Sequence, residues 1–253
     1  MNRLVLFCEG PEDLAALREV ILRQFAFAKP VPSLPPPIPV LVGELRRERL
    51  VKADLSLDLI IAGDRERVGR LAADLASYDS PQDPIARIGL SFDPNGSNEP
   101  LWREWLEGSL QALRLSRAGW VYAAQPEGRT ALEVVPLPWS WPGPVVYGLG
   151  DSHCLERVAV DLLGEASPVH HQRLGRWIDE LRAEPGATAP TWKTAARLWN
   201  ALALPDVAGA GFYAQVFGQN PATASVLGSK LAATDLGAAL ASFLRPTPAA
   251  ATP

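Results

Sequence analysis

Leu4-Val-Leu-Phe-Cys-Glu-Gly-Pro-Glu-Asp-Leu14 is the segment in which a strand of this chain runs into a helix. The apolar residues at its start predict a short buried strand that ends at Glu9-Gly10. A helix is expected from Pro11, because proline is favoured at the first helical position, and Glu12 and Asp13 suit the positive end of the helix dipole. Glu9 is therefore predicted at the carboxyl edge of an open α/β sheet, where ligands bind in such folds.

The composition of the 253 residues is that of an ordinary soluble protein, with 47% hydrophobic and 21% charged residues and a formal net charge of −4. This balance excludes an overall basic nucleic-acid-binding surface. The chain has no run of about 18 apolar residues, so we expect no membrane span. Two cysteines, Cys8 and Cys154, argue against a disulfide framework. The first residues lack a secretory pattern, and a cytoplasmic location is the expectation.

Strand and helix patterns alternate over residues 1–150 and predict an α/β domain with an open, mostly parallel sheet and flanking helices. Further strands are expected at 57–62, 85–92, 120–123, 131–135 and 145–147, and residues 38–43 are compatible with another. Helices are expected at 11–27, 64–76 and 101–115, and an irregular segment at 136–144. The pattern after about residue 152 is helical, which predicts an α-helical C-terminal portion over 165–245 and a disordered tail at 246–253.

Oxygen-bearing side chains follow two of the predicted strands. Glu9 follows the first strand and Asp93 the third, and Asn95 points the same way as Asp93 if the backbone stays extended. Glu156 stands at the start of the helix after the last predicted strand. Three hard oxygen donors at one sheet edge would suit Mg²⁺ or Mn²⁺, and such an ion can activate water and stabilise a phosphoryl displacement.

The order of these residues resembles that of a Toprim domain, which topoisomerases, bacterial-type primases and the OLD nucleases share. Glu9-Gly10 is followed by Asp13 and later by an apolar strand ending in Asp93-Pro-Asn95. Leu155-Glu156 resembles the third acidic element of OLD-like and stand-alone Toprim proteins, which would extend the first domain to about residue 164. Residues 192–218 are similar to the C-terminal part of a poorly characterised Toprim-like family. The resemblance covers most of the chain in order.

This resemblance implies a role for each matching residue. Glu9 would be a metal ligand or a general acid/base, and Asp93 would be a primary metal ligand. Asp13 and Glu156 would support a second metal ion. Lys193 would lie near the site and stabilise negative charge that develops on a phosphate.

Asn95 separates two interpretations of the function, since the family usually has a second Asp at this position and Asn keeps a carbonyl ligand but loses a charge. The first interpretation is an Mg²⁺- or Mn²⁺-dependent, nuclease-like protein that acts on nucleic acid. The second is a non-catalytic binding or regulatory module with a degraded metal site. A third, an unrelated nucleotide-binding fold, lacks both a GxGxxG motif and a P-loop.

Simpler structural roles exist for the same residues. Glu9 would fit a solvated turn, Asp93 and Asn95 an Asx turn, and Glu156 the first turn of a helix. A run of basic residues could form a phosphate-binding rim or only a solvated face. These residues are Arg46, Arg47, Arg49, Lys52, Arg65, Arg67 and Arg70.

Overall fold

The computed structural model describes residues 2–29, 47–53, 55–64, 66–68, 70–71, 85–94, 99–109, 114–118, 121–125, 132–141, 146–150 and 153–245. Within these ranges, seven strands form one sheet in the order β2-β3-β1-β4-β7-β6-β5. The strands are β1 (Asn2–Cys8), β2 (Arg47–Lys52), β3 (Leu55–Ile61), β4 (Ile85–Phe92), β5 (Arg114–Ala118), β6 (Val121–Gln125) and β7 (Leu132–Pro138). The central strands β3-β1-β4-β7 are parallel, and antiparallel strands flank them on both sides. The predicted α/β class is confirmed.

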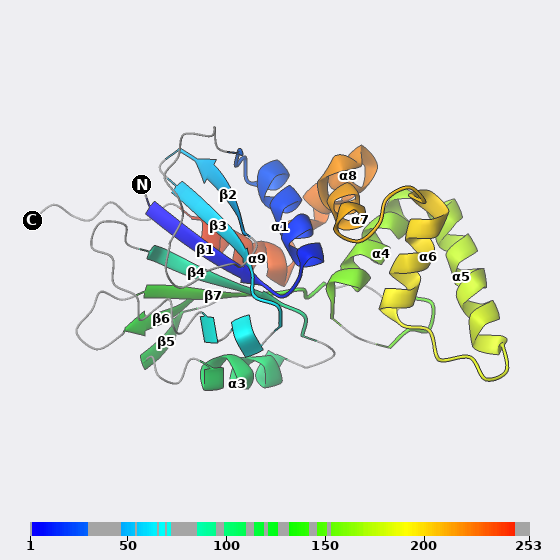
Figure 1. Cartoon of the computed structure of the whole chain (residues 1–253), viewed down its shortest axis with the longest axis horizontal. Helices are drawn as coiled ribbons and strands as arrows, with labels where there is room; N and C mark the ends of the chain where they lie inside the picture. The colour runs from blue at the N-terminus through cyan, green and yellow to red at the C-terminus, as the bar shows by residue number, and fades with distance from the viewer. Residues whose placement is uncertain are drawn as a thin grey trace, which may run out of the picture.

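Helices cover the sheet and then form a separate layer beyond its end (Figure 1). They are α1 (Pro11–Gln24), α3 (Glu99–Ser109), α4 (Leu155–Ala166), α5 (Pro168–Ala183), α6 (Trp192–Ala203), α7 (Ala210–Ala214), the π-helical turn η1 (Gln215–Gln219), α8 (Pro221–Leu231) and α9 (Asp235–Leu244). After β3, residues 66–68 and 70–71 are helical, and the rest of the helix predicted at 64–76 lies outside the described residues.

The two faces of the sheet carry different helices. The side chains of β4, which point alternately to one face and the other, demonstrate this. A side chain at Gly89 would meet Phe243 of α9, whereas Phe92 packs against Trp105 of α3 with ring centroids 5.1 Å apart. Because successive residues of a strand point to opposite faces, α9 and α3 lie on opposite sides of the sheet. Helix α1 packs against β3, and the apolar residues of the helix belong to the same core cluster as Leu4, Leu6 and Cys8 of β1.

The C-terminal helices are tied to the sheet at two places. Helix α1 packs against α7 and η1, while α9 returns to pack on β7 and β4. The buried guanidinium of Arg87 on β4 donates a 3.1 Å hydrogen bond to the carbonyl of Phe243, near the end of α9. A cation at that end also suits the negative pole of the helix. The helical portion and the sheet therefore share one continuous hydrophobic core.

The helix predicted over 101–115 is too long, because α3 ends at Ser109 and Arg114–Ala118 form β5. Pairing between β5 and β6 is antiparallel, from Arg114 opposite Gln125 to Ala118 opposite Val121. Partner-strand pairing overrides a short helical pattern, since strand formation depends on tertiary context. The segment predicted at 38–43 and the tail at 246–253 lie outside the described residues.

Residues 136–138, predicted to be irregular, instead complete β7. Pro136 and Pro138 pair with β4, but among the described residues the pairing of β6 with β7 covers Leu132–Val134 alone. Prolines are tolerated in a strand at such an unpaired edge, because they have no N–H to donate. The strand predicted at 145–147 is also wrong: Tyr147 lies in a turn with φ 57°, a left-handed conformation that a strand excludes.

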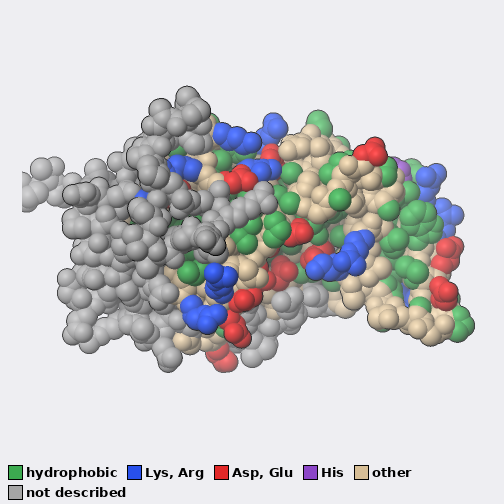
Figure 2. All heavy atoms as spheres, in the orientation of Figure 1, with side chains coloured by type: hydrophobic (Ala, Val, Ile, Leu, Met, Phe, Trp, Pro, Cys, Tyr) green, Lys and Arg blue, Asp and Glu red, His purple; other side chains and the backbone are tan. Residues whose placement is uncertain are grey.

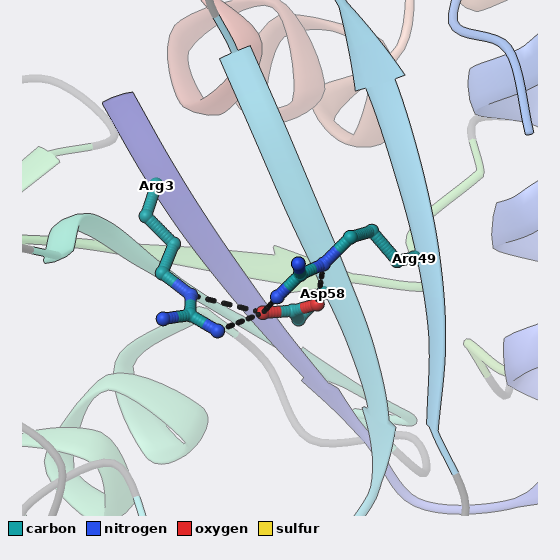
Figure 3. Close-up of polar contacts among 3 residues, drawn as sticks. All are labelled: Arg3, Arg49 and Asp58. Atoms are coloured by element: carbon teal, nitrogen blue, oxygen red, sulfur yellow. Dashed lines mark hydrogen bonds and ion pairs between the residues drawn. The ribbon is translucent and has the colours of Figure 1, made fainter. Parts of the chain in front are cut away.

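Three of the basic residues belong to β2, namely Arg47, Arg49 and Lys52. The Arg49 guanidinium donates to Asp58 of β3, at 2.8 Å from Nε to Oδ1, and Arg3 of β1 donates to the same carboxylate at 3.0 Å (Figure 3). Only 1% of the Asp58 side chain and 4% of the Arg3 side chain is exposed. One carboxylate thus joins three neighbouring strands.

We expect Asp58→Ala to destabilise the protein by about 3–5 kcal/mol, because it removes the carboxylate that pairs with the buried guanidinium of Arg3 and the half-buried one of Arg49. Urea unfolding followed by circular dichroism measures the change. As a control, Asp179→Ala removes the exposed carboxylate that pairs with Arg182 and should change the stability by less than about 1 kcal/mol. Equal effects of the two substitutions would contradict the assignment.

Candidate functional site

A cavity of about 480 Å³ opens at the carboxyl ends of the parallel strands. The helical layer adjoins the sheet at this end (Figure 1). The walls of the cavity include the four predicted acids, Glu9, Asp13, Asp93 and Glu156. Strands β1 and β4 are neighbours and run in parallel, so the residues that follow them reach the same edge. The structure therefore brings together acids that lie far apart in the sequence.

The turn that holds Glu9 is fixed from both sides. The carbonyl of Glu9 accepts a 2.9 Å hydrogen bond from the N–H of Gly63, which follows β3. The N–H of Gly10 donates to Oδ2 of Asp13 at 3.0 Å, and Trp139 donates its indole N–H to Oδ1 of Asp13 at 2.7 Å. Both oxygens of Asp13 are thus engaged in holding the start of α1.

Asp93 connects β4 to α4. Its Oδ1 accepts a 2.9 Å hydrogen bond from the N–H of Leu155, the first residue of α4. Among the described residues, the side chain of Cys154, at the N-cap position, makes no capping hydrogen bond. Asp93 therefore satisfies an N–H that would otherwise lack a helical partner, as capping side chains do. This contact places Glu156, the next residue of α4, at the cavity wall.

Helix α6 supplies the opposite wall with Lys193, Arg197 and Asn200. The Nζ of Lys193 lies 3.9 Å from Oε1 of Glu156, and 67% of the lysine side chain is exposed. Basic and acidic groups lie next to each other at this junction in the space-filling view (Figure 2). The sequence prediction included Lys193 but missed Arg197 and Asn200, although their spacing of four and seven residues from Lys193 places all three on one helical face.

Helices α1, α4 and α6 begin at the cavity, and a charged first-turn residue of each lines it: Glu12 of α1, Glu156 of α4 and Lys193 of α6. The amino end of a helix carries a partial positive charge that stabilises nearby carboxylates. The helix termini therefore offset part of the repulsion among the acids.

Burial and repulsion still raise the pKa of two carboxyl groups. Burial is the main cause for Asp13, whose pKa rises to about 7, with a further contribution from Glu9, while its hydrogen bond from Trp139 opposes the rise. Burial also dominates for Asp93, whose pKa rises to about 8, and the charges of Asp13 and Glu156 add to it. A shared cation would relieve the same repulsion, because it favours the deprotonated forms.

The donor set fits a hard divalent cation by its chemistry, since carboxylates are the protein ligands that Mg²⁺ and Mn²⁺ prefer. Across the part of the chain that is described, no three His, Cys, Asp or Glu side chains are already arranged to hold a metal ion. Carboxylates would have to turn toward a bound ion. Asn95, the further predicted ligand, lies outside the described residues.

The two cysteines near the acids, Cys8 and Cys154, are buried. Cys8 is fully buried and its thiol donates to the carbonyl of Ile60 at 3.4 Å. Burial raises the pKa of Cys8, and it raises that of Cys154 to about 12. Both thiols therefore stay protonated near neutral pH, and neither is suited to nucleophilic attack.

No family model and no curated protein matches this chain. A search of solved structures finds the crystal structure of hypothetical protein PH0156 from Pyrococcus horikoshii OT3, with a TM-score of 0.75 and 16% sequence identity. The match covers 97% of this chain and 100% of that one. At this identity the likeness shows the fold alone, and the resemblance to Toprim domains stays a prediction. Among the helices of the described residues, none has the length and apolarity that crossing a membrane requires.

We expect the metal-free protein to lose stability as the pH rises from about 4, the ordinary carboxyl pKa, to about 8. The raised pKa of Asp93 means that the folded chain binds more protons than the unfolded chain across this range, so rising pH favours unfolding. Asp93→Asn, which keeps an acceptor for the Leu155 N–H, should flatten the dependence. Thermal melts in a chelator at several pH values measure both proteins, and parallel curves would contradict the expectation.

Proposed function

We propose that this protein binds Mg²⁺ or Mn²⁺ and carries out phosphodiester or phosphoryl-transfer chemistry on nucleic acid, most simply as a nuclease. The observation that carries the proposal is the shared cavity, in which Glu9, Asp93 and Glu156 lie opposite the cations of α6. Such chemistry needs both carboxylates that bind a metal ion and cationic side chains that attract the phosphate. The order of the acids, which resembles a Toprim domain, supports the same proposal.

Glu9, Asp93 and Glu156 are the residues proposed to hold the metal. Asp13 has a positioning role in this proposal, because its two oxygens already accept hydrogen bonds from Gly10 and Trp139. It also adds negative charge to the site. A bound divalent cation would act as a Lewis acid toward a phosphate oxygen and as an activator of water.

Lys193 and Arg197 are proposed to bind the phosphate. They lie one helical turn apart on the face of α6 that lines the cavity. Their charges attract an anionic substrate toward acids that would otherwise repel it. The 3.9 Å contact of Lys193 with Glu156 leaves the ammonium beside the proposed metal ligands, where it would stabilise charge on a reacting phosphate.

A non-catalytic binding or regulatory module is the second candidate. Two observations favour it: Asn95 replaces a family carboxylate, and the described residues contain no ready-made group of three metal ligands. In that case the cavity would bind a phosphate-bearing ligand through α6 without catalysis. Metal affinity separates the two candidates.

We expect the wild-type protein to bind Mn²⁺ in isothermal titration, and Glu9→Gln and Asp93→Asn to weaken binding by about tenfold or more, since each removes a charged ligand. Asp179→Asn, on the exposed side of α5, is the matched control and should bind as the wild type does. Single- and double-stranded DNA and RNA with Mn²⁺ then test for cleavage. If the folded wild-type protein shows no binding of Mn²⁺ at millimolar concentration, the result would favour the second candidate.

We expect Lys193→Ala to reduce the rate of Mn²⁺-dependent cleavage by about tenfold or more, because it removes a positive charge beside the reacting phosphate. The affinity for Mn²⁺ should stay the same or increase, since the lysine repels the ion. Lys230→Ala, whose ammonium pairs with Asp161 and Glu165 on α4, is the control for a lost surface cation. A fall in Mn²⁺ affinity with unchanged turnover of bound enzyme would assign Lys193 a structural role instead.

A further inference from the structure

A second cavity, of about 380 Å³, adjoins the first and shares Asp93, Glu156 and Lys193 with it. Its other walls come from the segment before α4, the segment before α6 and the first turn of α6. The residues are Gly150, Cys154, Pro190, Thr191 and Trp192. Three of the groups proposed to act on the phosphate therefore lie on a wall that the two cavities share, whereas Glu9 lines only the first cavity.

The walls of the second cavity are held in place by contacts of Trp192. Its indole N–H donates a 2.8 Å hydrogen bond to the carbonyl of Gly150, which joins α6 to the segment before α4. The guanidinium of Arg157 lies over its ring, 5.6 Å from the centroid. Thr191 is fixed at the N-cap of α6, where its hydroxyl accepts from the N–H of Thr194 at 3.2 Å. The cavity is thus built from anchored groups.

Each cavity falls within the range of about 300–1,000 Å³ that is typical of small-molecule sites. A phosphate bound at the shared wall, beside Lys193 and the amino end of α6, would have one hollow on each side. Helix amino ends bind phosphate through their N–H groups and dipole. A terminal phosphate has one organic group and would fill only one hollow, whereas an internal phosphodiester has two.

We propose that the second cavity is a subsite for the nucleoside on one side of the reacting phosphate, so that the protein takes internal phosphodiesters in preference to terminal phosphates. This inference rests on the proposed function. It adds to that function a source of specificity for a diester, namely Gly150, Thr191 and Trp192. These residues lie outside the predicted acidic motifs. The second nucleoside occupies the first cavity, along the face of α6 that carries Arg197 and Asn200.

Gly150 offers a substitution that fills the second cavity alone. Apart from its chain neighbours, a Cβ at this position would have no atom of the described residues within 4 Å, and Gly150 does not line the first cavity. Gly150→Leu therefore places a side chain at the wall of the second cavity while leaving the Gly150 carbonyl available to Trp192. Gly108→Leu on α3 is the matched control, because a Cβ there also meets no atom within 4 Å and Gly108 lines neither cavity.

The test is isothermal titration of the full, Mn²⁺-loaded chain with two probes, thymidylyl-thymidine and thymidine 5′-monophosphate. Chromatography after each titration checks whether the dinucleotide is intact. We expect the dinucleotide to bind about tenfold or more tightly than the mononucleotide. Gly150→Leu should remove this preference without changing the affinity for Mn²⁺ or for the mononucleotide, and Gly108→Leu should preserve it.

Equal binding of the two probes to the wild-type protein would overturn the subsite, and so would a preference that survives in Gly150→Leu. Binding of neither probe to a chain that binds Mn²⁺ would also overturn it. Failure of the wild-type chain to bind Mn²⁺ is a different result, because it removes the proposed function and the subsite with it. The metal titration, done first, distinguishes the two failures.

Discussion

Repulsion among carboxylates in one cavity is the constraint around which this end of the molecule is organised. Burial and neighbouring acids push the pKa values of Asp13 and Asp93 toward and above neutrality. Such an arrangement destabilises a fold unless something opposes it. The opposing contributions are three helix amino ends, the hydrogen bonds to Asp13 and Asp93, and the cations of α6. Perturbed acids held in this way are more typical of a functional site than of a structural ion pair.

The contrast with Asp58 supports this distinction. Asp58 is more deeply buried than the cavity acids, with 1% of the residue exposed against 9% for Asp13, but it lies between two guanidinium groups that neutralise it within the sheet. Asp58 lines neither of the two cavities that hold the proposed site. The acids at the strand ends instead line one cavity of about 480 Å³. Carboxylates of the same sheet thus differ in their surroundings, since Asp58 is neutralised by cations whereas the cavity acids repel one another.

The part of the site that could be predicted from the sequence is the part fixed by local structure. The strand-turn-helix unit around Glu9 needs only an apolar run, a glycine and a helix start, and Asp93 follows an unmistakable strand. Arg197 and Asn200 could not be placed at the cavity, because that depends on how α6 packs against α4. The strand β5 was missed for a related reason, since its pairing with β6 is not visible in a short helical pattern. Val146 and Tyr147 have a strand composition, but a turn at Tyr147 that the sequence does not specify overrides it.

The position of α6 makes the site a property of the whole chain rather than of the sheet. The sheet supplies Glu9 and Asp93, and the first turn of α4 adds Glu156, so this half of the cavity is acidic. A phosphate would be repelled by that half alone. The cations arrive from α6, which packs against α4, while α7 and η1 pack against α1. Helix α4 therefore carries Glu156 and also packs against the helix that supplies the basic wall. Because acidic and basic charges both depend on α4, the electrostatic balance of the cavity and the packing of the helices around it cannot be separated.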